Sequence, residues 1–325
     1  MRKIKYSEAI NETLHQLLKS NKKVFLIGQG VTSPWYVGTT TVGLIDRFGS
    51  NRVFDTPVSE NAVTGLGVGA ALTGMHPIVV HPRMDFMYYA MDQIANQAAN
   101  WYYMFGSQMS VPITIWGIIN RGGEQGAQHS QALQAIFAHI PGLKVVMPST
   151  PYDVKGLLVA SVEDENPVIF IDDRWLYNYE GDVPKELYSI EIGKAIVRRK
   201  GNDVTIVATS YMVYKAIEAA KILEKEGIDA EIIDLRTVKP MDKQLLYDSV
   251  KKTKRLVIAD AGWKTCGIGA EISATIAESN ILTTLKAPIA RVTLPDTPAP
   301  ASSVLEQAYY PESKDIVLAV KDLLK

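Results

Sequence analysis

One carboxylate, Glu60, stands at the start of a small-residue segment that has the pattern of a helix. A turn containing Pro57 precedes it, and Gly65, Gly67 and Gly69 follow it. Each glycine in a helix costs about 1 kcal/mol relative to alanine, so such a helix needs close packing in order to form. The spacing leaves two interpretations open: another backbone or a flat ligand lies against this helix, or the helix simply packs on a sheet.

Glu60 could carry out acid–base chemistry if its surroundings exclude water. Val58, Val63 and Leu66 stand close to it in the sequence, and burial among apolar side chains raises the pKa of a carboxyl group enough for it to share a proton at neutral pH. The alternative is a solvated glutamate in the first turn of a helix that Ser59 caps, an ordinary use of both residue types. The residues alone leave both interpretations open.

Two aromatic residues, Phe86 and Tyr89, could provide a stacking face for a flat heterocycle. They lie three residues apart in a long helix expected over residues 84–103, and residues at that spacing share one side of a helix. An aromatic pair at helical spacing more often belongs to a hydrophobic core. We therefore treat this pair as a hypothesis that substitution can test.

A cation, Arg83, precedes Phe86 by three residues, which places it one helical turn away or at the end of the preceding strand. A guanidinium near an apolar pocket needs an anionic partner, and the carboxylate or phosphate of a substrate offers two parallel acceptors. A salt bridge to a nearby acid, such as Asp85 or a residue of a partner chain, is the alternative.

Among the five histidines, His129 alone ends a glycine-rich irregular loop and begins a polar His-Ser-Gln triplet. Imidazole titrates near neutrality, so a histidine in such a loop could donate a proton to a developing alkoxide or orient an incoming acceptor. A loop histidine bonded to backbone is the alternative interpretation.

An oxygen-rich segment, residues 161–167, ends a predicted helix. Free carbonyl groups at a helix end, together with the side-chain oxygens of Asp164 and Asn166, suit a hard cation. Taken alone, the segment is more typical of a solvated turn.

The elements that must position these residues alternate regularly along the chain. Short apolar runs at 24–28, 77–80, 111–117, 143–147 and 168–171 predict buried strands separated by helices, and the same alternation returns after residue 200. This pattern predicts an α/β fold with parallel sheets covered on both faces. The polar stretch 179–188 contains Gly and Pro, so we expect one domain over 1–185 and a smaller one over 186–325.

The composition is that of an ordinary globular protein. With 34 basic and 35 acidic residues the formal charge is -1, which does not favour a nucleic-acid partner. The single cysteine, Cys266, excludes an intrachain disulfide and is typical of a reducing compartment. The N-terminal residues lack the apolar core of a signal peptide, and no apolar run approaches the roughly 20 residues that span a membrane. We therefore expect a soluble cytoplasmic protein.

Two long runs resemble a known family. DTPVSENAVTGLGVGAALTGMHPIVV and GAQHSQALQAIFAHIPGLKVVMPSTPYDVKGLL are similar to the beta subunit of the thiamin-diphosphate-dependent 2-oxoacid dehydrogenases, the E1 component, and the similarity spans nearly all of the chain. The resemblance implies a pyrimidine-binding α/β domain followed by a transketolase C-terminal-like α/β domain.

The resemblance also assigns roles to individual residues. Glu60 matches the glutamate that activates the coenzyme: a carboxyl group bonded to a ring nitrogen of the aminopyrimidine favours the imino tautomer, whose exocyclic nitrogen removes the proton from C2 of the thiazolium. Phe86 matches an aromatic that contacts the pyrimidine, and Tyr89 is its neighbour in the site. His129 matches the catalytic histidine, while the role of His139 stays open between structural and catalytic.

The metal sites are implied in the same way. Related beta subunits hold a monovalent cation such as K⁺ through positions that match Ile113, Ser161, Val162, Asp164 and Asn166. The GDG run and the paired-Asn motif that hold Mg²⁺ on the diphosphate do not occur in this chain. A partner resembling the alpha subunit should therefore supply that half of the site, giving a heterotetramer that passes its acyl group to a lipoyl acyltransferase (E2).

Several positions depart from the family. Gln29 and Gly30 stand where most relatives have acidic residues, Val80 replaces another acidic residue, and Arg83 is an added cation. These changes leave pyruvate, acetoin, a branched-chain oxoacid or a larger anionic substrate open. A transketolase-type carbon–carbon transferase subunit and a non-catalytic scaffold subunit with the same fold are the alternative functions.

Overall fold

The computed structural model describes residues 1–325, which form two compact units. The first unit comprises residues 1–121 and 136–192, and the second unit comprises residues 122–135 and 193–325. The second unit thus includes a loop from the middle of the N-terminal half, which the sequence pattern did not predict. The domain boundary expected at residue 185 stays a prediction.

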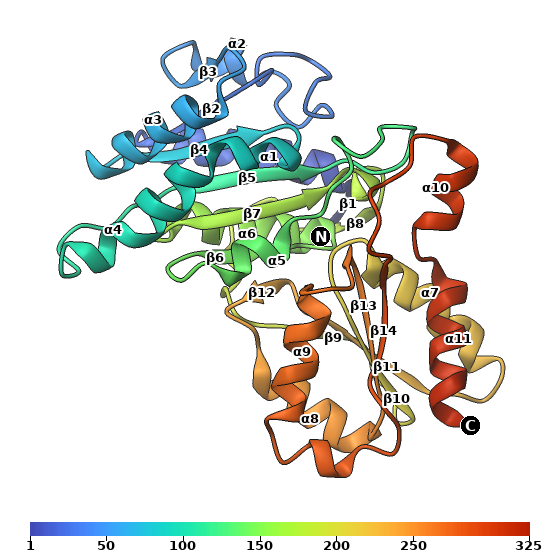
Figure 1. Ribbon diagram of the computed structural model, residues 1–325. Coiled ribbons are helices and arrows are strands. Elements are labelled where there is room, and N and C mark those ends of the chain that lie inside the picture. Colours follow the sequence, from blue (N-terminus) through green and yellow to red (C-terminus); the bar gives the residue numbers. More distant parts are fainter. The chain divides into compact units, whose positions relative to one another are not determined.

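The first unit is built on a parallel sheet whose strands follow the order β6, β7, β5, β4, β2, β3 (Figure 1). All of its longer strands are buried, apart from the half-buried His76 at the start of β4, as expected for a parallel sheet covered on both faces. The expected α/β class is confirmed. The strands are β2 (Val24–Gly28), β3 (Val53–Asp55), β4 (His76–His81), β5 (Thr114–Ile119), β6 (Lys144–Val146) and β7 (Val168–Asp173).

Helices flank this sheet, and a short antiparallel pair, β1 (Arg2–Lys5) with β8 (Glu180–Val183), joins the two ends of the unit. Helix α1 packs on α6, and α3 packs on β4. The helices are α1 (Tyr6–Ser20), α2 (Leu44–Phe48), α3 (Glu60–Leu72), α4 (Ala99–Met104), α5 (Gln134–His139), α6 (Pro151–Glu163) and the 3₁₀ turn η3 (Arg174–Leu176).

The small residues of α3 have distinct surroundings. A Cβ added at Gly67 would lie 2.5 Å from Val79 of β4, whereas one added at Gly69 would meet nothing within 4 Å. The helix therefore packs closely on the sheet at Gly67, as one of the two interpretations expected, and leaves its Gly69 side open.

The long helix expected over residues 84–103 is not regular. A 3₁₀ helix η1 (Met84–Ala90) is followed by a π-helix η2 (Asp92–Ala98) and then by α4. The side-chain amide of Asn100 donates to the carbonyl oxygen of Ala95 at 2.9 Å, within the wider π turn. In a 3₁₀ helix, residues three apart eclipse one another, so η1 aligns Phe86 with Tyr89 more closely than an α-helix would.

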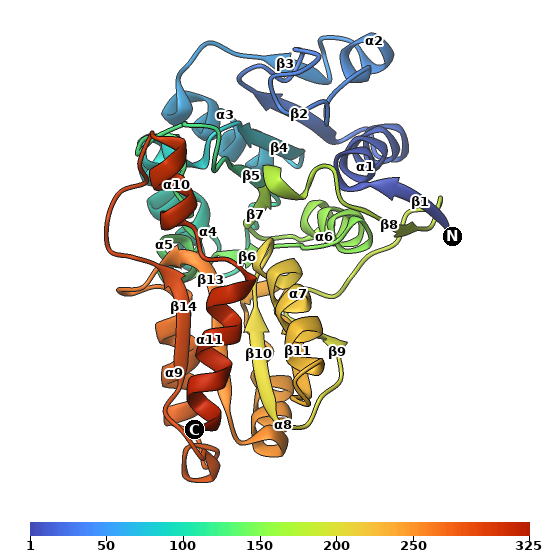
Figure 2. The same cartoon turned by 90° about the vertical axis from the view of Figure 1, so that its right-hand side faces the viewer.

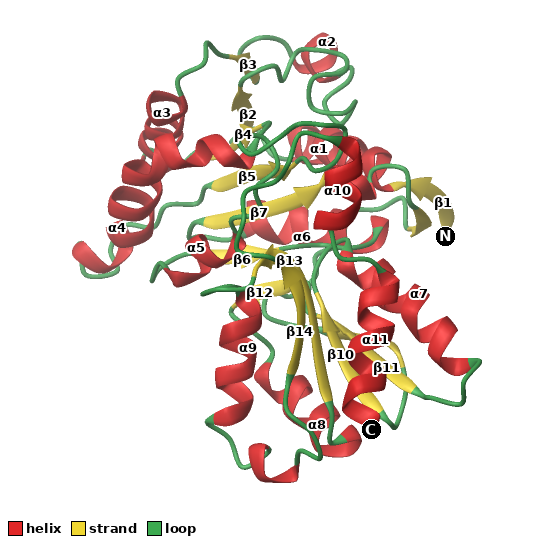
Figure 3. Cartoon of the chain, turned by 45° about the vertical axis from the view of Figure 1, so that its right-hand side comes forward, coloured by secondary structure: helices red, strands yellow, loops and turns green.

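The second unit contains a sheet in the order β14, β13, β10, β11, β9, in which only β9 runs antiparallel to its neighbour. Helices α7 and α11 pack together on one face, and α8 and α9 cover the other (Figures 2 and 3). The strands are β9 (Ile196–Arg199), β10 (Val204–Ala208), β11 (Ala230–Asp234), β13 (Leu256–Trp263) and β14 (Ala290–Leu294), with the short β12 (Thr237–Lys239). The helices are α7 (Met212–Glu224), α8 (Lys243–Thr253), α9 (Ile268–Ala277), η4 (Leu282–Thr284), α10 (Ser303–Tyr309) and α11 (Ser313–Leu324).

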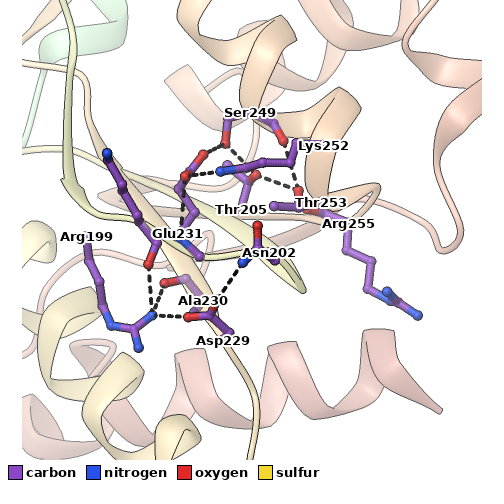
Figure 4. A network of polar contacts seen from close by, with 12 residues as sticks. Arg199, Asn202, Thr205, Asp229, Ala230, Glu231, Ser249, Lys252, Thr253 and Arg255 are labelled. Carbon is purple, nitrogen blue, oxygen red and sulfur yellow. Dashed lines mark hydrogen bonds and ion pairs between the residues drawn. The ribbon is translucent and has the colours of Figure 1, made fainter.

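A buried carboxylate ties α8 to this sheet (Figure 4). Glu231 of β11 is 3% exposed and accepts hydrogen bonds from Ser249 Oγ at 2.5 Å and from the Lys252 ammonium group. Thr205 of β10 bonds to the Ser249 hydroxyl at 2.7 Å. Because a buried charge is tolerated only when it is paired and hydrogen-bonded, we assign this network a structural role.

None of the helices is long and apolar enough to cross a membrane.

Candidate functional site

A pocket of the first unit opens at the carboxyl ends of the adjacent strands β2, β3 and β4, with a cavity volume of about 160 Å³. Ligands of open α/β sheets bind at this edge, where loops leave parallel strands. The turn before α3, the end of β4 and helix η1 provide most of the wall. The lining residues are Gln29, Tyr36, Thr56, Pro57, Val58, Ser59, Glu60, Val63, Val80, His81, Pro82, Arg83, Phe86 and Tyr89.

Glu60 is the first residue of α3, is half-buried and lines the pocket beside Val58 and Val63. Ser59 occupies the N-cap position, as the alternative interpretation expected, but its side chain makes no capping hydrogen bond. Leu66, expected near Glu60, does not line the pocket and is 55% exposed. Leu66 is six positions after Glu60, and at 3.6 residues per turn this places it about 120° around the helix axis from Glu60.

The predicted aromatic pair lies on one wall. The rings of Phe86 and Tyr89 stack with centroids 6.3 Å apart and an interplanar angle of 26°. Tyr89 is 68% exposed and Phe86 half-buried, so this pair is not part of the hydrophobic core. Glu60, Phe86 and Tyr89 therefore meet in one cavity.

Arg83 also lines the pocket, half-buried, and its Nη1 donates to the carbonyl oxygen of Pro82 at 3.2 Å. Burial lowers the pKa of Arg83, and the charge of Arg174 lowers it further, while Asp85 acts in the opposite direction. His81 is fully buried, and burial lowers its pKa to about 4. Among the lining residues, Glu60 carries the carboxyl group and Arg83 the guanidinium group.

The loop that follows β2 is fixed by β3. Asp55 accepts hydrogen bonds from the backbone amide of Gly30 at 2.8 Å and from the Thr32 hydroxyl. Gln29 donates through Nε2 to the Tyr36 hydroxyl at 3.2 Å. Gln29 and Tyr36 thus contribute two uncharged polar groups to the pocket wall.

A buried acidic cluster lies at the carboxyl end of β7. Asp172 accepts from Trp116 Nε1 at 3.0 Å and from the Tyr177 hydroxyl at 2.9 Å. Burial raises the pKa of Asp172 to about 7, although both hydrogen bonds and the charge of Arg174 oppose this shift. Arg174 also donates to the backbone carbonyl of Tyr36, which lines the pocket.

This cluster was missed as a functional feature by sequence reasoning, although a signal exists. Asp172 and Asp173 are the last two residues of the buried strand β7, and Arg174 follows them directly. Asp173 forms a salt bridge to Arg121 at 2.5 Å with both side chains buried. Charged residues at the carboxyl end of a parallel strand indicate a site or its supporting groups.

His129 belongs to the second unit and is half-buried, with its backbone amide bonded to the Gly126 carbonyl at 3.3 Å. His139 is exposed at the end of α5. The catalytic role of His129 stays a prediction.

The expected cation ligands already have protein partners. No cluster of three or more His, Cys, Asp or Glu side chains suits a metal ion, and Asp164 forms a salt bridge with Lys144, whose ammonium group provides a positive charge there. The other contacts are Val168 N to Ile113 O (3.0 Å), His76 Nδ1 with Val162 O (3.0 Å), Ser161 Oγ to Leu157 O (2.7 Å) and Asn166 N to Asp164 Oδ1 (2.9 Å). Backbone carbonyls retain a second lone pair, so the monovalent-cation site stays a prediction.

Comparison with known proteins identifies the family to which this chain is similar. Residues 2–180 match the transketolase pyrimidine binding domain, and residues 193–316 match the transketolase C-terminal domain. The beta subunit of acetoin:2,6-dichlorophenolindophenol oxidoreductase from Bacillus subtilis is 42% identical, over 99% of this chain and 98% of its own length. The mitochondrial beta subunit of the pyruvate dehydrogenase E1 component from Bos taurus is also 42% identical, over 98% of this chain and 89% of its own length.

A solved structure described as a split gene transketolase, inactive beta4 tetramer, superposes with a TM-score of 0.82 over 99% of this chain and 98% of its own. At 24% identity it supports the fold alone. The family matches and the relatives confirm the resemblance and the order of the two α/β domains. The chain therefore belongs to the beta subunits of the thiamin-diphosphate-dependent E1 components, the family of the pyruvate and acetoin dehydrogenases.

Proposed function

We propose that this chain is the beta subunit of a heterotetrameric 2-oxoacid dehydrogenase (E1), which decarboxylates a 2-oxoacid and passes the acyl group to a lipoyl acceptor. One observation carries the proposal: Glu60 and Phe86 line the same pocket, so a carboxyl group and an aromatic face are available to one flat ring. That is the pair of groups that an aminopyrimidine needs.

The lining residues fit the pyrimidine half of thiamin diphosphate. When bound, the coenzyme supplies a carbon nucleophile for attack on a 2-oxo carbonyl group. Phe86 provides the stacking face, and the Glu60 carboxyl group holds a proton toward a ring nitrogen. Val58 and Val63 reduce the access of water to that carboxyl group, which strengthens its hydrogen bond. In this assignment His129 donates a proton to substrate or orients the acceptor.

An alpha subunit completes the site in this proposal. The chain lacks the motif that holds Mg²⁺ on the diphosphate, so the partner would hold that ion, while K⁺ would bind near Asp164. Val58, Leu66 and Tyr89 are exposed apolar residues in and beside the pocket rim, and the Gly69 side of α3 is open. These features support a partner that covers this face of the first unit.

The choice of substrate is part of this proposal. Acetoin and pyruvate are named for the relatives from Bacillus subtilis and Bos taurus, respectively. Arg83 supports a substrate that carries an acidic group and is larger than pyruvate, because a half-buried guanidinium is best satisfied by a carboxylate or phosphate. A cytoplasmic location and delivery of the acyl group to E2 are parts of the same proposal.

Reconstitution tests the proposal. Calorimetry with Mg²⁺ present should show that the chain binds thiamin diphosphate weakly alone and tightly in complex with an alpha subunit identified by co-purification. The complex should release CO₂ from a 2-oxoacid and reduce an artificial electron acceptor. Tight coenzyme binding and decarboxylation by the isolated chain would contradict the split site, and transfer to a sugar acceptor would favour a transketolase-type enzyme. A complex that lacks both activities would favour the scaffold function.

A further inference from the structure

The loop 122–135, which contains His129, belongs to the second unit. Its first residues have an uncommon backbone conformation, with positive φ at Gly122 (72°), Gly123 (67°), Glu124 (60°) and Gly126 (70°). Non-glycine residues such as Glu124 rarely adopt this conformation, and they do so where surrounding contacts impose it. The contacts of this loop should therefore identify what imposes its shape.

The N-terminal half of the loop is bound to helix α10. The backbone amide of Glu124 donates to both carboxylate oxygens of Glu306, at 3.0 and 3.1 Å. The Glu124 side chain in turn accepts a hydrogen bond from the backbone amide of Ser303, the first residue of α10, at 3.1 Å. Glu306 is only 7% exposed, and a carboxylate removed from water requires such donors.

The C-terminal end of the loop is bound to β13. Gln134 donates through Nε2 to both oxygens of Asp260, at 3.0 and 3.1 Å. Asp260 is 1% exposed and also accepts from Thr209 Oγ1 at 2.7 Å and from the amide of Gly262 at 3.3 Å. The carboxylate is thus held by strands β10 and β13, and it fixes Gln134 rather than the reverse.

The two carboxylates fix the loop at residues 124 and 134, and His129 lies five positions from each. A loop that is fixed on both sides of a residue has few conformations left at that residue, so the contacts of residues 124 and 134 restrict where the imidazole of His129 can lie. We propose that Glu306 and Asp260 are positioning residues through which the second unit sets the orientation of His129. This inference rests on the proposed function of His129, and it gives the C-terminal domain a role in the chemical step.

Substitutions in the reconstituted alpha–beta complex test the inference. Glu306→Ala should lower kcat at least tenfold and leave the apparent affinity for thiamin diphosphate unchanged. Glu306→Gln should restore most of the activity, because an amide oxygen still accepts from the Glu124 amide. Glu278→Ala is the matched control, since Glu278 is an exposed glutamate of the same unit. Asp260→Asn should behave like Glu306→Ala, because Asp260 accepts four hydrogen bonds from Gln134, Thr209 and Gly262 through two oxygens, and an amide provides a single oxygen acceptor.

A second readout does not depend on activity. The rate at which diethyl pyrocarbonate modifies His129, followed by mass spectrometry of its peptide, should change several-fold in Glu306→Ala, while the rates of His15 and His139 stay constant. Amide exchange should increase within residues 122–135 and not in β10 or β13. Unchanged kcat and unchanged His129 modification in Glu306→Ala would overturn the inference.

The variant His129→Ala separates this inference from the proposed function. If it is inactive while Glu306→Ala is fully active, the positioning role fails and the catalytic assignment stands. If His129→Ala is fully active, the catalytic assignment itself fails. If Glu306→Ala loses exchange protection throughout the second unit and Glu306→Gln does not recover, the contact is structural and the positioning role is rejected.

Discussion

Glu60 and Arg83 approach one pocket from different elements: Glu60 is the first residue of helix α3, and Arg83 lies between the end of strand β4 and the start of helix η1. Glu60 shares the cavity with Phe86, whereas Arg83 lies near Arg174 and Tyr36. The pocket therefore holds a carboxyl group and a guanidinium group within one cavity. The proposed function assigns Glu60 to the coenzyme and Arg83 to the substrate, and each assignment can be tested separately.

Replacing Glu60 with Gln should lower the kcat of the reconstituted complex by a factor of about 100 to 10,000, or roughly 3 to 5 kcal/mol in activation free energy. The amide keeps a hydrogen-bonding group in place but cannot share a proton. Glu186→Gln, a change at an exposed glutamate of the same unit, is the control and should be neutral. Steady-state kinetics together with an unchanged circular-dichroism spectrum provide the check, and full activity of the Gln variant would reject the assignment.

Replacing Arg83 with Met should raise the apparent KM for the acidic substrate roughly tenfold, equivalent to about 1.4 kcal/mol. Arg83→Lys keeps the charge but loses the planar fork, so its KM should fall between those of the wild type and the Met variant. If KM does not change while the free energy of unfolding decreases, Arg83 serves the fold through a neighbour such as Asp85, and the substrate role is wrong.

The pocket residues that could be predicted from the sequence are those whose geometry is local. Phe86 and Tyr89 share a side in an α-helix or a 3₁₀ helix because they are three positions apart, and the 3₁₀ form makes the alignment closer. Glu60 follows a strand and a turn within a few residues, so its place at the strand ends needs little tertiary information.

Long-range partners could not be predicted in this way. Trp116 donates to Asp172 across 56 residues of sequence, and such a pair depends on β5 and β7 being neighbours in the sheet. The anchoring of residues 124 and 134 by the second unit is equally non-local. Helix α11, in contrast, carries buried Ile316, Val317 and Val320 at helical spacing, so it could have been predicted and was missed.

The glycines of α3 provide a matched pair of stability measurements. Gly67→Ala should destabilise the chain, because its Cβ would come within 2.5 Å of Val79 and 3.1 Å of Ile113 in a packed core. Gly69→Ala meets nothing within 4 Å and should stabilise the isolated chain by about 0.5–1 kcal/mol, since alanine is the better helix former. Urea unfolding of the two variants gives the comparison, and equal effects of both substitutions would contradict this packing of α3.

The buried Asp172 predicts how stability depends on pH. Its folded-state pKa of about 7 lies above the ordinary value of 3.8, so between these values the folded chain holds a proton that the unfolded chain has released. Stability from this group is therefore fully present below pH 3.8 and is lost as the pH rises through 7. Between pH 6 and pH 8 the loss should be about 1 kcal/mol.

Asp172→Asn removes the titration of this carboxyl group. The loss of about 1 kcal/mol in the free energy of unfolding between pH 6 and pH 8 should therefore disappear in the variant. The comparison uses slopes, because the amide oxygen of Asn can accept from only one of the two donors, Trp116 Nε1 and the Tyr177 hydroxyl, which lowers stability at every pH by a constant amount. Urea unfolding at pH 6, 7 and 8 for both proteins measures the two slopes. Equal slopes would mean that Asp172 is ionised throughout this range, and the Arg174 charge would then outweigh the burial of the carboxyl group.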